Sequence, residues 1–212
     1  MNVITQEKLI VIFRGVRQDQ LPELLPALYD GGVRVIEIAF APRDPDTADK
    51  TGALIRTART IIGTRMFVGA GTVVNERLTV AAHRAGAQFI FSPNTKKEVI
   101  TLTKQLGMLS IPGAFTPSEC VDAYDAGADL VKLFPITANE VGYVKNIMRP
   151  LSYIPFLCVG GVTPETIPLY LAAGAVGVGT GISVLKPELL AAGDYGAIRE
   201  LAAAHVRAVQ GR

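Results

Sequence analysis

The sequence contains few of the residues that form metal sites and disulfides. It has two cysteines and two histidines among 212 residues. Cys120 and Cys158 are far apart and fit neither a metal-ligand spacing nor a CxxC motif, so we expect buried or incidental thiols and no disulfide. His83 and His205 lie in expected helices, far from strand ends, and we interpret both as surface residues. We therefore predict neither a metal ion nor another cofactor.

Excess charge and long apolar runs are lacking as well. The formal net charge is +2, and no cluster of lysine and arginine with neighbouring aromatic residues stands out. No apolar run reaches the roughly 18 residues that span a bilayer. The first eight residues lack a basic segment that leads into an apolar stretch. We expect a cytoplasmic protein that binds neither nucleic acid nor membranes.

Two charged residues stand in runs that are typical of buried strands. Lys132 lies in DLVKLFP at 129–135, and Glu37 lies in VRVIEIAF at 33–40. Taking a charged side chain out of water costs several kcal/mol unless it is paired or changes its protonation state. A buried lysine that loses its proton becomes a nucleophile. Lys132 and Glu37 are therefore candidate catalytic residues, and a structural ion pair or exposure at strand ends is the alternative.

The rest of the chain alternates short β-branched runs with longer amphipathic stretches. Glycine recurs where the helical patterns end, as at Gly86 and Gly174. Eight such units without a linker predict one domain over residues 1–212, a (β/α)8 TIM barrel. An open doubly wound sheet is the alternative, but no GxGxxG follows the first expected strand. The expected strands are 9–13, 33–40, 66–69, 88–91, 108–110, 130–134, 156–159 and 176–178, and the expected helices lie near 19–30, 47–62, 76–84, 96–106, 117–126, 140–148, 164–173 and 195–209.

In a barrel of this kind, functional side chains come from the carboxyl ends of the strands. Glu37 and Lys132 would then face one cavity from opposite walls. Glycine-rich loops follow the last two expected strands, at 160–163 and 179–183. Loops at these two places often bind phosphate through backbone amides, although each glycine alone also fits a tight turn. The sequence thus predicts a site for an anionic substrate, with Gly160, Gly161, Gly179, Thr180 and Gly181 at the phosphate.

Six short segments around the two charged residues occur in an order that carries a family resemblance. They are EI at 37–38, GAGTV at 69–73, SP at 92–93, IPG at 111–113, KLFP at 132–135 and GGV at 160–162. Together they resemble the class I aldolases that cleave 2-keto-3-deoxy-6-phosphogluconate, its galactonate epimer or 4-hydroxy-2-oxoglutarate. The match covers nearly the whole chain, and it implies a phosphorylated 2-keto acid as substrate and a homotrimer without metal.

The resemblance also implies roles for individual residues. Lys132 would form a Schiff base with the substrate, and Glu37 would act as the general acid and base. Thr72 would hold the carboxylate end of the substrate, while Pro93 and Phe134 would line the pocket. The glycines of the loops at 160–163 and 179–183 would receive the phosphate.

One departure from the family pattern bears on the substrate. Ala41 stands where gluconate-type relatives carry an arginine, so we expect Arg14 to bind the carboxylate, with Arg43 as the rival. Val159 stands where those relatives often carry threonine. We therefore expect cleavage of 2-dehydro-3-deoxy-6-phosphogalactonate, or else of the gluconate epimer, to pyruvate and glyceraldehyde 3-phosphate in carbohydrate metabolism of the Entner–Doudoroff type. The alternatives are a 4-hydroxy-2-oxoglutarate aldolase, a sugar-phosphate isomerase or epimerase, and a catalytically silent phosphate-binding protein.

Overall fold

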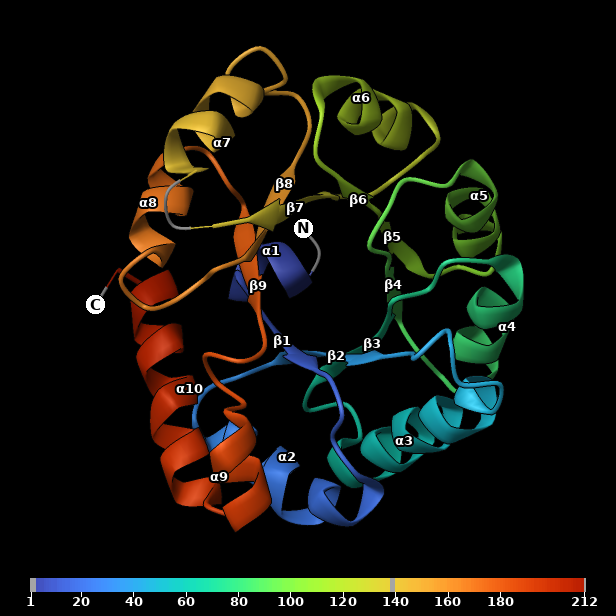
Figure 1. Cartoon of the computed structure of the whole chain (residues 1–212), viewed down its shortest axis with the longest axis vertical. Helices are drawn as coiled ribbons and strands as arrows, with labels where there is room; N and C mark the ends of the chain where they lie inside the picture. Colours follow the sequence, from blue (N-terminus) through green and yellow to red (C-terminus); the bar gives the residue numbers. More distant parts are fainter. Residues whose placement is uncertain (1–2, 138–139, 212) are drawn as a thin grey trace.

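The computed structural model describes residues 3–137 and 140–211, and these residues form a nearly closed barrel of parallel strands surrounded by helices (Figure 1). The strand order is β5-β4-β3-β2-β1-β9-β8-β7-β6. The predicted (β/α)8 TIM barrel is confirmed. The strands in the described residues are β1 (Leu9–Phe13), β2 (Val35–Ala39), β3 (Phe67–Gly71), β4 (Phe89–Phe91), β5 (Leu109–Ile111), β6 (Gly113–Ala114), β7 (Val131–Ile136), β8 (Phe156–Gly160) and β9 (Gly177–Thr180).

The barrel closes through one interrupted segment. Pro112 separates β5 from β6, since a proline has no N–H for the strand ladder. β5 pairs with β4 on one side, and β6 pairs with β7 on the other. The carbonyl of Pro112 still accepts a hydrogen bond from the Lys132 amide at 2.9 Å. β5 thus corresponds to the strand expected at 108–110, and β6 is an additional short strand just after it, which accounts for nine strands where the sequence predicted eight.

The helices other than α1 form the outer ring in Figure 1. The helices expected over 47–62, 76–84 and 195–209 begin and end at the predicted residues, whereas α1, α9 and the 3-10 helix η1 were not expected. The described helices are α1 (Val3–Glu7), η1 (Gln18–Gln20), α2 (Leu21–Asp30), α3 (Thr47–Ile62), α4 (Glu76–Arg84), α5 (Lys97–Gln105), α6 (Pro117–Asp125), α7 (Val141–Met148), α8 (Ile167–Ala172), α9 (Pro187–Ala192) and α10 (Tyr195–Val209).

Local signals in the sequence explain where several helices begin and end. Thr116 caps α6 by accepting from the Glu119 amide, and Glu119 closes the capping box. Glycines with positive φ angles follow the ends of α4 and α8, as predicted, with φ of 88° at Gly86 and 110° at Gly174. The helix expected from about residue 164 begins three residues later, because 163–166 form a separate turn.

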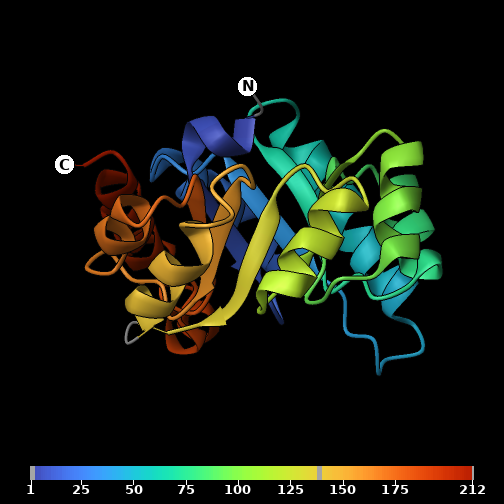
Figure 2. The ribbon, with the colours of Figure 1, turned by 90° about the horizontal axis from the view of Figure 1, so that it is seen from above.

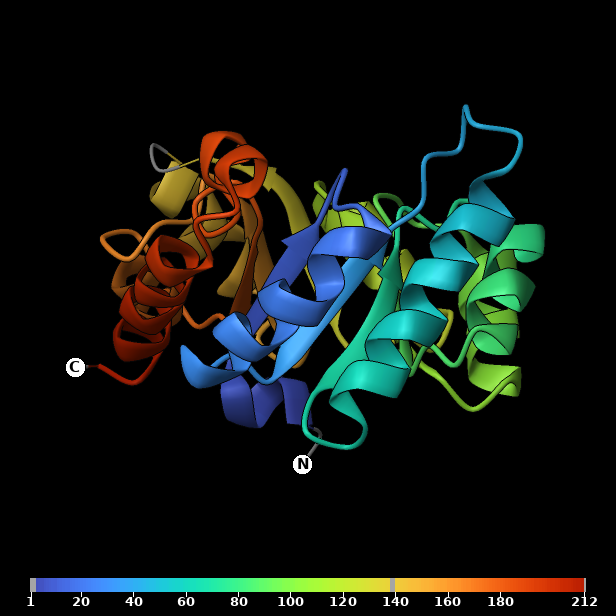
Figure 3. The same ribbon diagram turned by 90° about the horizontal axis from the view of Figure 1, so that it is seen from below.

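Two apolar cores lie on the two sides of the strands. One fills the barrel interior and includes Val35, Leu130 and Leu157, and the other lies between the strands and the helices. Helix α1 closes one end of the barrel, where Ile4 joins the interior core (Figures 2 and 3). The loop between β2 and α3 projects from the opposite end in Figure 3. No helix in the described ranges is long and apolar enough to cross a membrane.

The expectation that both histidines lie on the surface is wrong for one of them. His83 on α4 is exposed, but His205 on α10 is only 1% exposed. The buried face of α10 consists of Ile198, Ala202, His205 and Val209. These positions follow the helical period, so His205 occupies the stripe that packs on the barrel.

We predict that Gly31→Ala lowers the free energy of unfolding by about 1–3 kcal/mol through overpacking. A Cβ at Gly31 would lie 2.8 Å from the Arg199 carbonyl oxygen and 2.9 Å from the Ala202 Cβ, both on α10. Gly52 on α3 is the matched control, because its nearest neighbour would be the flexible Arg56 side chain at 3.3 Å. Urea titrations should show Gly52→Ala unchanged or more stable, and equal stability of both variants would contradict the packing argument.

Candidate active site

Glu37 and Lys132 approach one another from opposite walls of the barrel. Glu37 lies on β2 and Lys132 on β7, which stand four strands apart in the sheet order. Residues alternate along each strand, so Ile36 and Ile38 belong to the outer core while Val35 belongs to the interior. Glu37 shares the inward direction of Val35. Lys132 likewise lies between Val131 and Leu133 of the outer core, so it also points inward.

The Glu37 carboxylate is buried in space that a glycine leaves open. Its side chain is 2% exposed. A Cβ at Gly71, the last residue of β3, would lie 0.9 Å from Glu37 Oε1. Within the described part of the chain, Glu37 Oε2 has no hydrogen-bond partner. Burial raises the pKa of Glu37 to about 7, against the opposing effect of the positive charges on Lys132 and Arg14.

Lys132 is buried between aromatic rings. Its side chain is 6% exposed, and Nζ lies 4.2 Å from the ring centroid of Phe91 and 4.3 Å from that of Phe134. Burial lowers the pKa of Lys132 to about 8; Glu37 opposes this shift and Arg14 adds to it. Each ring face stabilises an ammonium by about 0.5–2 kcal/mol. This is less than the several kcal/mol that desolvation of the ammonium costs. The amine is therefore deprotonated far more readily than an exposed lysine.

The alternative of a structural ion pair does not fit this geometry. None of the ion pairs among residues 3–137 and 140–211 joins Lys132 to Glu37. Instead, the pKa of Glu37 is about 7 and that of Lys132 is about 8, so both values lie near neutral pH. Coupled groups with pKa values shifted toward physiological pH are candidates for a functional site. The pair can supply both an amine nucleophile and a proton acceptor.

A pocket of about 330 Å³ opens at the carboxyl ends of β1, β8 and β9. Glu37 and Lys132 are not among its lining residues, but Phe134 contacts Lys132 and lines the pocket. Among the predicted site residues, the pocket brings together Arg14, Phe134, Val159, Gly160, Gly179, Thr180 and Gly181. It also includes Ile12, Ile182, Leu185 and Pro187, which the sequence did not single out.

Thr72, Pro93 and Gly161 lie outside this pocket. Thr72 follows β3 with a φ of 54°, a conformation that costs a β-branched residue about 1–3 kcal/mol. Its amide donates to the Phe91 carbonyl at 3.1 Å, next to the ring that contacts Lys132. The Pro93 carbonyl packs against Gly113, where a Cβ would lie 2.4 Å away. Thr72 and Pro93 thus lie at the ends of β3 and β4, across the barrel from β8 and β9.

The turn that follows β9 has the backbone geometry of an anion site. The amides of Val184 and Leu185 donate to the Gly181 carbonyl, which makes 181–185 a short helical turn. No backbone carbonyl in the described residues accepts from the amides of Ile182 and Ser183. Free amides at the start of a helical turn attract anions. The Gly161 amide, by contrast, already donates to the Ile136 carbonyl at 2.7 Å.

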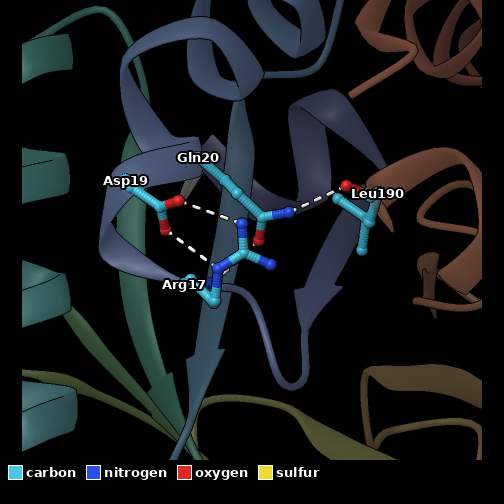
Figure 4. A network of polar contacts seen from close by, with 4 residues as sticks. All are labelled: Arg17, Asp19, Gln20 and Leu190. Carbon is cyan, nitrogen blue, oxygen red and sulfur yellow. Dashed lines mark hydrogen bonds and ion pairs between the residues drawn. The ribbon is translucent and has the colours of Figure 1, made fainter. Parts of the chain in front are cut away.

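Arg14 stands at the pocket on the turn after β1, and polar contacts fix this turn to α9 (Figure 4). Gln20 Nε2 donates to the Leu190 carbonyl at 2.9 Å, and Gln20 Oε1 accepts from the Arg17 amide at 2.9 Å. The Arg17 guanidinium donates twice to the Asp19 carboxylate. The turn that carries Arg14 is thereby held beside the helix that begins at the pocket residue Pro187.

Several known aldolases are similar to this chain in sequence and in fold. The family model described as KDPG and KHG aldolase matches residues 1–201. The chain is 33% identical over 183 residues to 2-dehydro-3-deoxy-6-phosphogalactonate aldolase of Escherichia coli strain K12, covering 86% of each chain. It is 30% identical over 202 residues to the KHG/KDPG aldolase of the same strain, covering 95% of this chain and 92% of the relative.

A solved structure described as native KDPGal superposes with a TM-score of 0.85 at 32% identity, covering 96% of this chain and 94% of that one. A second structure, of a 4-hydroxy-2-oxoglutarate and 2-deydro-3-deoxyphosphogluconate aldolase from TTHB1, superposes with a TM-score of 0.81 at 27% identity, covering 99% of each chain. Sequence and fold agree on the same relatives. This chain therefore belongs to the KDPG and KHG aldolase family, and it is an aldolase, a carbon–carbon lyase.

Proposed function

We propose that this chain is a Schiff-base aldolase that cleaves 2-dehydro-3-deoxy-6-phosphogalactonate or its gluconate epimer to pyruvate and glyceraldehyde 3-phosphate. The observation that carries the proposal is Lys132 Nζ, buried between Phe91 and Phe134 with its pKa lowered to about 8. Curated relatives named for each substrate support the substrate class. The homotrimer and the cytoplasmic location stay predictions that rest on the family resemblance.

The first half of the reaction uses the neutral amine. Lys132 Nζ attacks the 2-keto carbon, and loss of water leaves a protonated iminium joined to the enzyme. The iminium accepts the electron pair of the bond between carbons 3 and 4 as that bond breaks, which gives an enamine. The Glu37 carboxylate accepts the proton of the carbon-4 hydroxyl, and glyceraldehyde 3-phosphate leaves.

The second half returns the enzyme to its starting state. Protonated Glu37 delivers its proton to carbon 3 of the enamine, directly or through water, and the iminium forms again. Water then adds to carbon 2, and pyruvate leaves as the Lys132 amine is released. The pKa of about 7 for Glu37 suits both proton transfers, because a general acid and base works best near the operating pH.

Substrate placement follows from the groups around the pocket. Arg14 presents a guanidinium to the carboxylate beside carbon 2, in a region where its positive charge also acts on Glu37 and Lys132. The amides of Ile182 and Ser183, from which no backbone carbonyl in the described residues accepts, support a phosphate site on this turn. A 4-hydroxy-2-oxoglutarate aldolase is the second candidate, supported by the relatives named KHG/KDPG aldolase. An isomerase or epimerase would have no use for the buried amine.

The Schiff base is tested by reduction in the presence of pyruvate. We predict that borohydride fixes pyruvate to the peptide that contains Lys132, since the neutral amine forms the iminium. Peptide mass spectrometry should find no adduct in Lys132→Met and a normal adduct in Lys97→Met, which changes an exposed lysine on α5. Labelling at another lysine, or at none in the wild type, would rule out this mechanism.

The role of Glu37 is tested through the glycine beside it. Gly71→Ala places a methyl group where the Glu37 carboxylate lies, so the carboxylate must move. We predict that kcat falls by about 100-fold or more, the usual effect of a 1 Å error in the position of a catalytic group. Gly142→Ala on α7 is the control, because its Cβ would meet no atom within 4 Å. Similar kcat values for the two variants would show that the position of Glu37 does not matter.

The carboxylate site is tested by comparing two arginines. Arg14 lines the pocket, whereas Arg43 lies on the exposed loop between β2 and α3. We predict that Arg14→Met raises KM far more than Arg43→Met does, because a charge-assisted hydrogen bond contributes about 1.5–3 kcal/mol. Steady-state kinetics on both variants measure this. Equal and small effects would mean that neither arginine binds the carboxylate.

The preference between epimers is tested at Val159, whose apolar side chain lines the pocket. We predict that the galactonate epimer is cleaved at least as well as the gluconate epimer, and that Val159→Thr shifts the ratio of kcat/KM toward gluconate. An unpaired substrate hydroxyl costs about 1–3 kcal/mol on burial, and a threonine hydroxyl would offer it a partner. Strong preference of the wild type for gluconate would refute the galactonate assignment and leave the mechanism intact.

A further inference from the structure

A buried polar cluster joins three elements behind the pocket. Ser183 Oγ lies 2.9 Å from the Val162 carbonyl and 2.9 Å from His205 Nε2. Thr180 Oγ1 lies 3.1 Å from the same carbonyl and also contacts Ser183 Oγ. Val162 lies two residues after the end of β8, Thr180 ends β9, and His205 belongs to α10. The cluster therefore ties the loops after β8 and β9 to one helix.

The ring of His205 has a defined role in this cluster. Its Nδ1 lies 2.8 Å from the Leu201 carbonyl, which only accepts hydrogen bonds, so Nδ1 carries the proton. Burial lowers the pKa of His205, against the raising effects of the Leu201 carbonyl and of the Glu165 charge, and the ring is neutral. Nε2 then accepts, and the one proton of the Ser183 hydroxyl lies within hydrogen-bond distance of two acceptors, His205 Nε2 and the Val162 carbonyl. The Thr180 hydroxyl also donates to the Val162 carbonyl.

The cluster acts on the pocket from outside it. Thr180, Gly181 and Ile182 line the pocket, whereas Ser183 and His205 do not. Ser183 belongs to the helical turn at 181–185, whose first amides are free for an anion. A hydrogen bond from its side chain to a helix on the barrel surface fixes the rotation of that turn. Amides held in place in this way bind an anion without the entropy cost of ordering the turn.

We propose that His205 is a positioning residue for the phosphate end of the substrate, acting through Ser183 on the turn at 181–185. This inference rests on the proposed function, since it assumes that the turn binds phosphate. His205 contacts neither the pocket nor Lys132 and takes no part in the chemical steps. The neutral ring gives the Ser183 hydroxyl an acceptor on α10 in addition to the Val162 carbonyl, and these two contacts restrict the orientation of the hydroxyl and of its turn.

A purely structural role for His205 would have different consequences. Loss of packing between α10 and the barrel would weaken the fold and lower activity on every substrate alike. Loss of positioning weakens only the binding of the phosphate. A KM effect that is confined to phosphorylated substrates therefore separates the two roles.

The test compares His205→Leu, His205→Gln and Ser183→Ala with two controls. His205→Leu removes the acceptor, whereas the amide oxygen of Gln can accept from Ser183 in its place. Thr103→Val removes another fully buried hydroxyl, on α5, and His83→Leu changes the exposed histidine. The readouts are KM and kcat on the preferred phosphorylated substrate and on 4-hydroxy-2-oxoglutarate, and the rise in melting temperature on adding inorganic phosphate.

We expect His205→Leu and Ser183→Ala to raise KM for the phosphorylated substrate by about tenfold or more, with kcat within about threefold of the wild type. KM for 4-hydroxy-2-oxoglutarate should stay unchanged, and so should pyruvate trapping at Lys132. Phosphate should raise the melting temperature of the wild type and of both controls but not that of His205→Leu. His205→Gln should recover most of the wild-type KM.

Several outcomes overturn the proposal. Equal KM changes on both kinds of substrate, or a failure of His205→Gln to recover KM while the protein stays folded, would assign His205 to the fold alone. If His205→Leu does not fold, a normal KM in Ser183→Ala is sufficient to refute the positioning role. A wild type that phosphate does not stabilise also refutes it. The separate failure of pyruvate trapping at Lys132 in the wild type would refute the proposed function instead.

Discussion

The desolvation of Lys132 is the constraint on which this structure depends. A lysine amine inside a barrel costs several kcal/mol as an ammonium, and the faces of Phe91 and Phe134 offset only part of this cost. The pKa of the amine therefore falls to about 8. The same physical effect raises the pKa of Glu37 on the opposite wall to about 7. One barrel interior thus shifts the pKa values of both groups toward neutral pH.

The rest of the barrel keeps these two groups buried and close to the pocket at the carboxyl ends of the strands. Gly71 leaves the space that the Glu37 carboxylate fills, at the carboxyl end of β3. Helix α1 closes the opposite end of the barrel with Ile4, which keeps water away from the interior core (Figure 3). The turn after β9 presents free amides beside the pocket, and α10 holds that turn through His205 and Ser183.

Much of this arrangement could be predicted from the sequence, because charges in apolar strand runs are costly and therefore informative. Lys132 and Glu37 were identified on that ground, and the alternation of eight strand-like runs with amphipathic stretches predicted the barrel. The need for a glycine at position 71 could not be predicted, because it arises from the Glu37 side chain on the neighbouring strand. His205 was expected on the surface because it lies on a helix far from the strand ends, although the spacing of Ile198, Ala202 and Val209 puts it on the buried stripe of α10. Helices α1 and α9 are too short for their periodicity to stand out.

The most direct test of this account is the titration of Lys132 itself in the enzyme without substrate. In protein with 13C-labelled lysine, NMR can follow the carbon next to the amine. The signal that is missing from the spectrum of Lys132→Met belongs to Lys132. We predict a transition near pH 8 and a smaller step near pH 7 that disappears in Glu37→Gln. A single transition at the ordinary pKa of lysine or above would mean that Lys132 stays an ammonium, which would contradict the account.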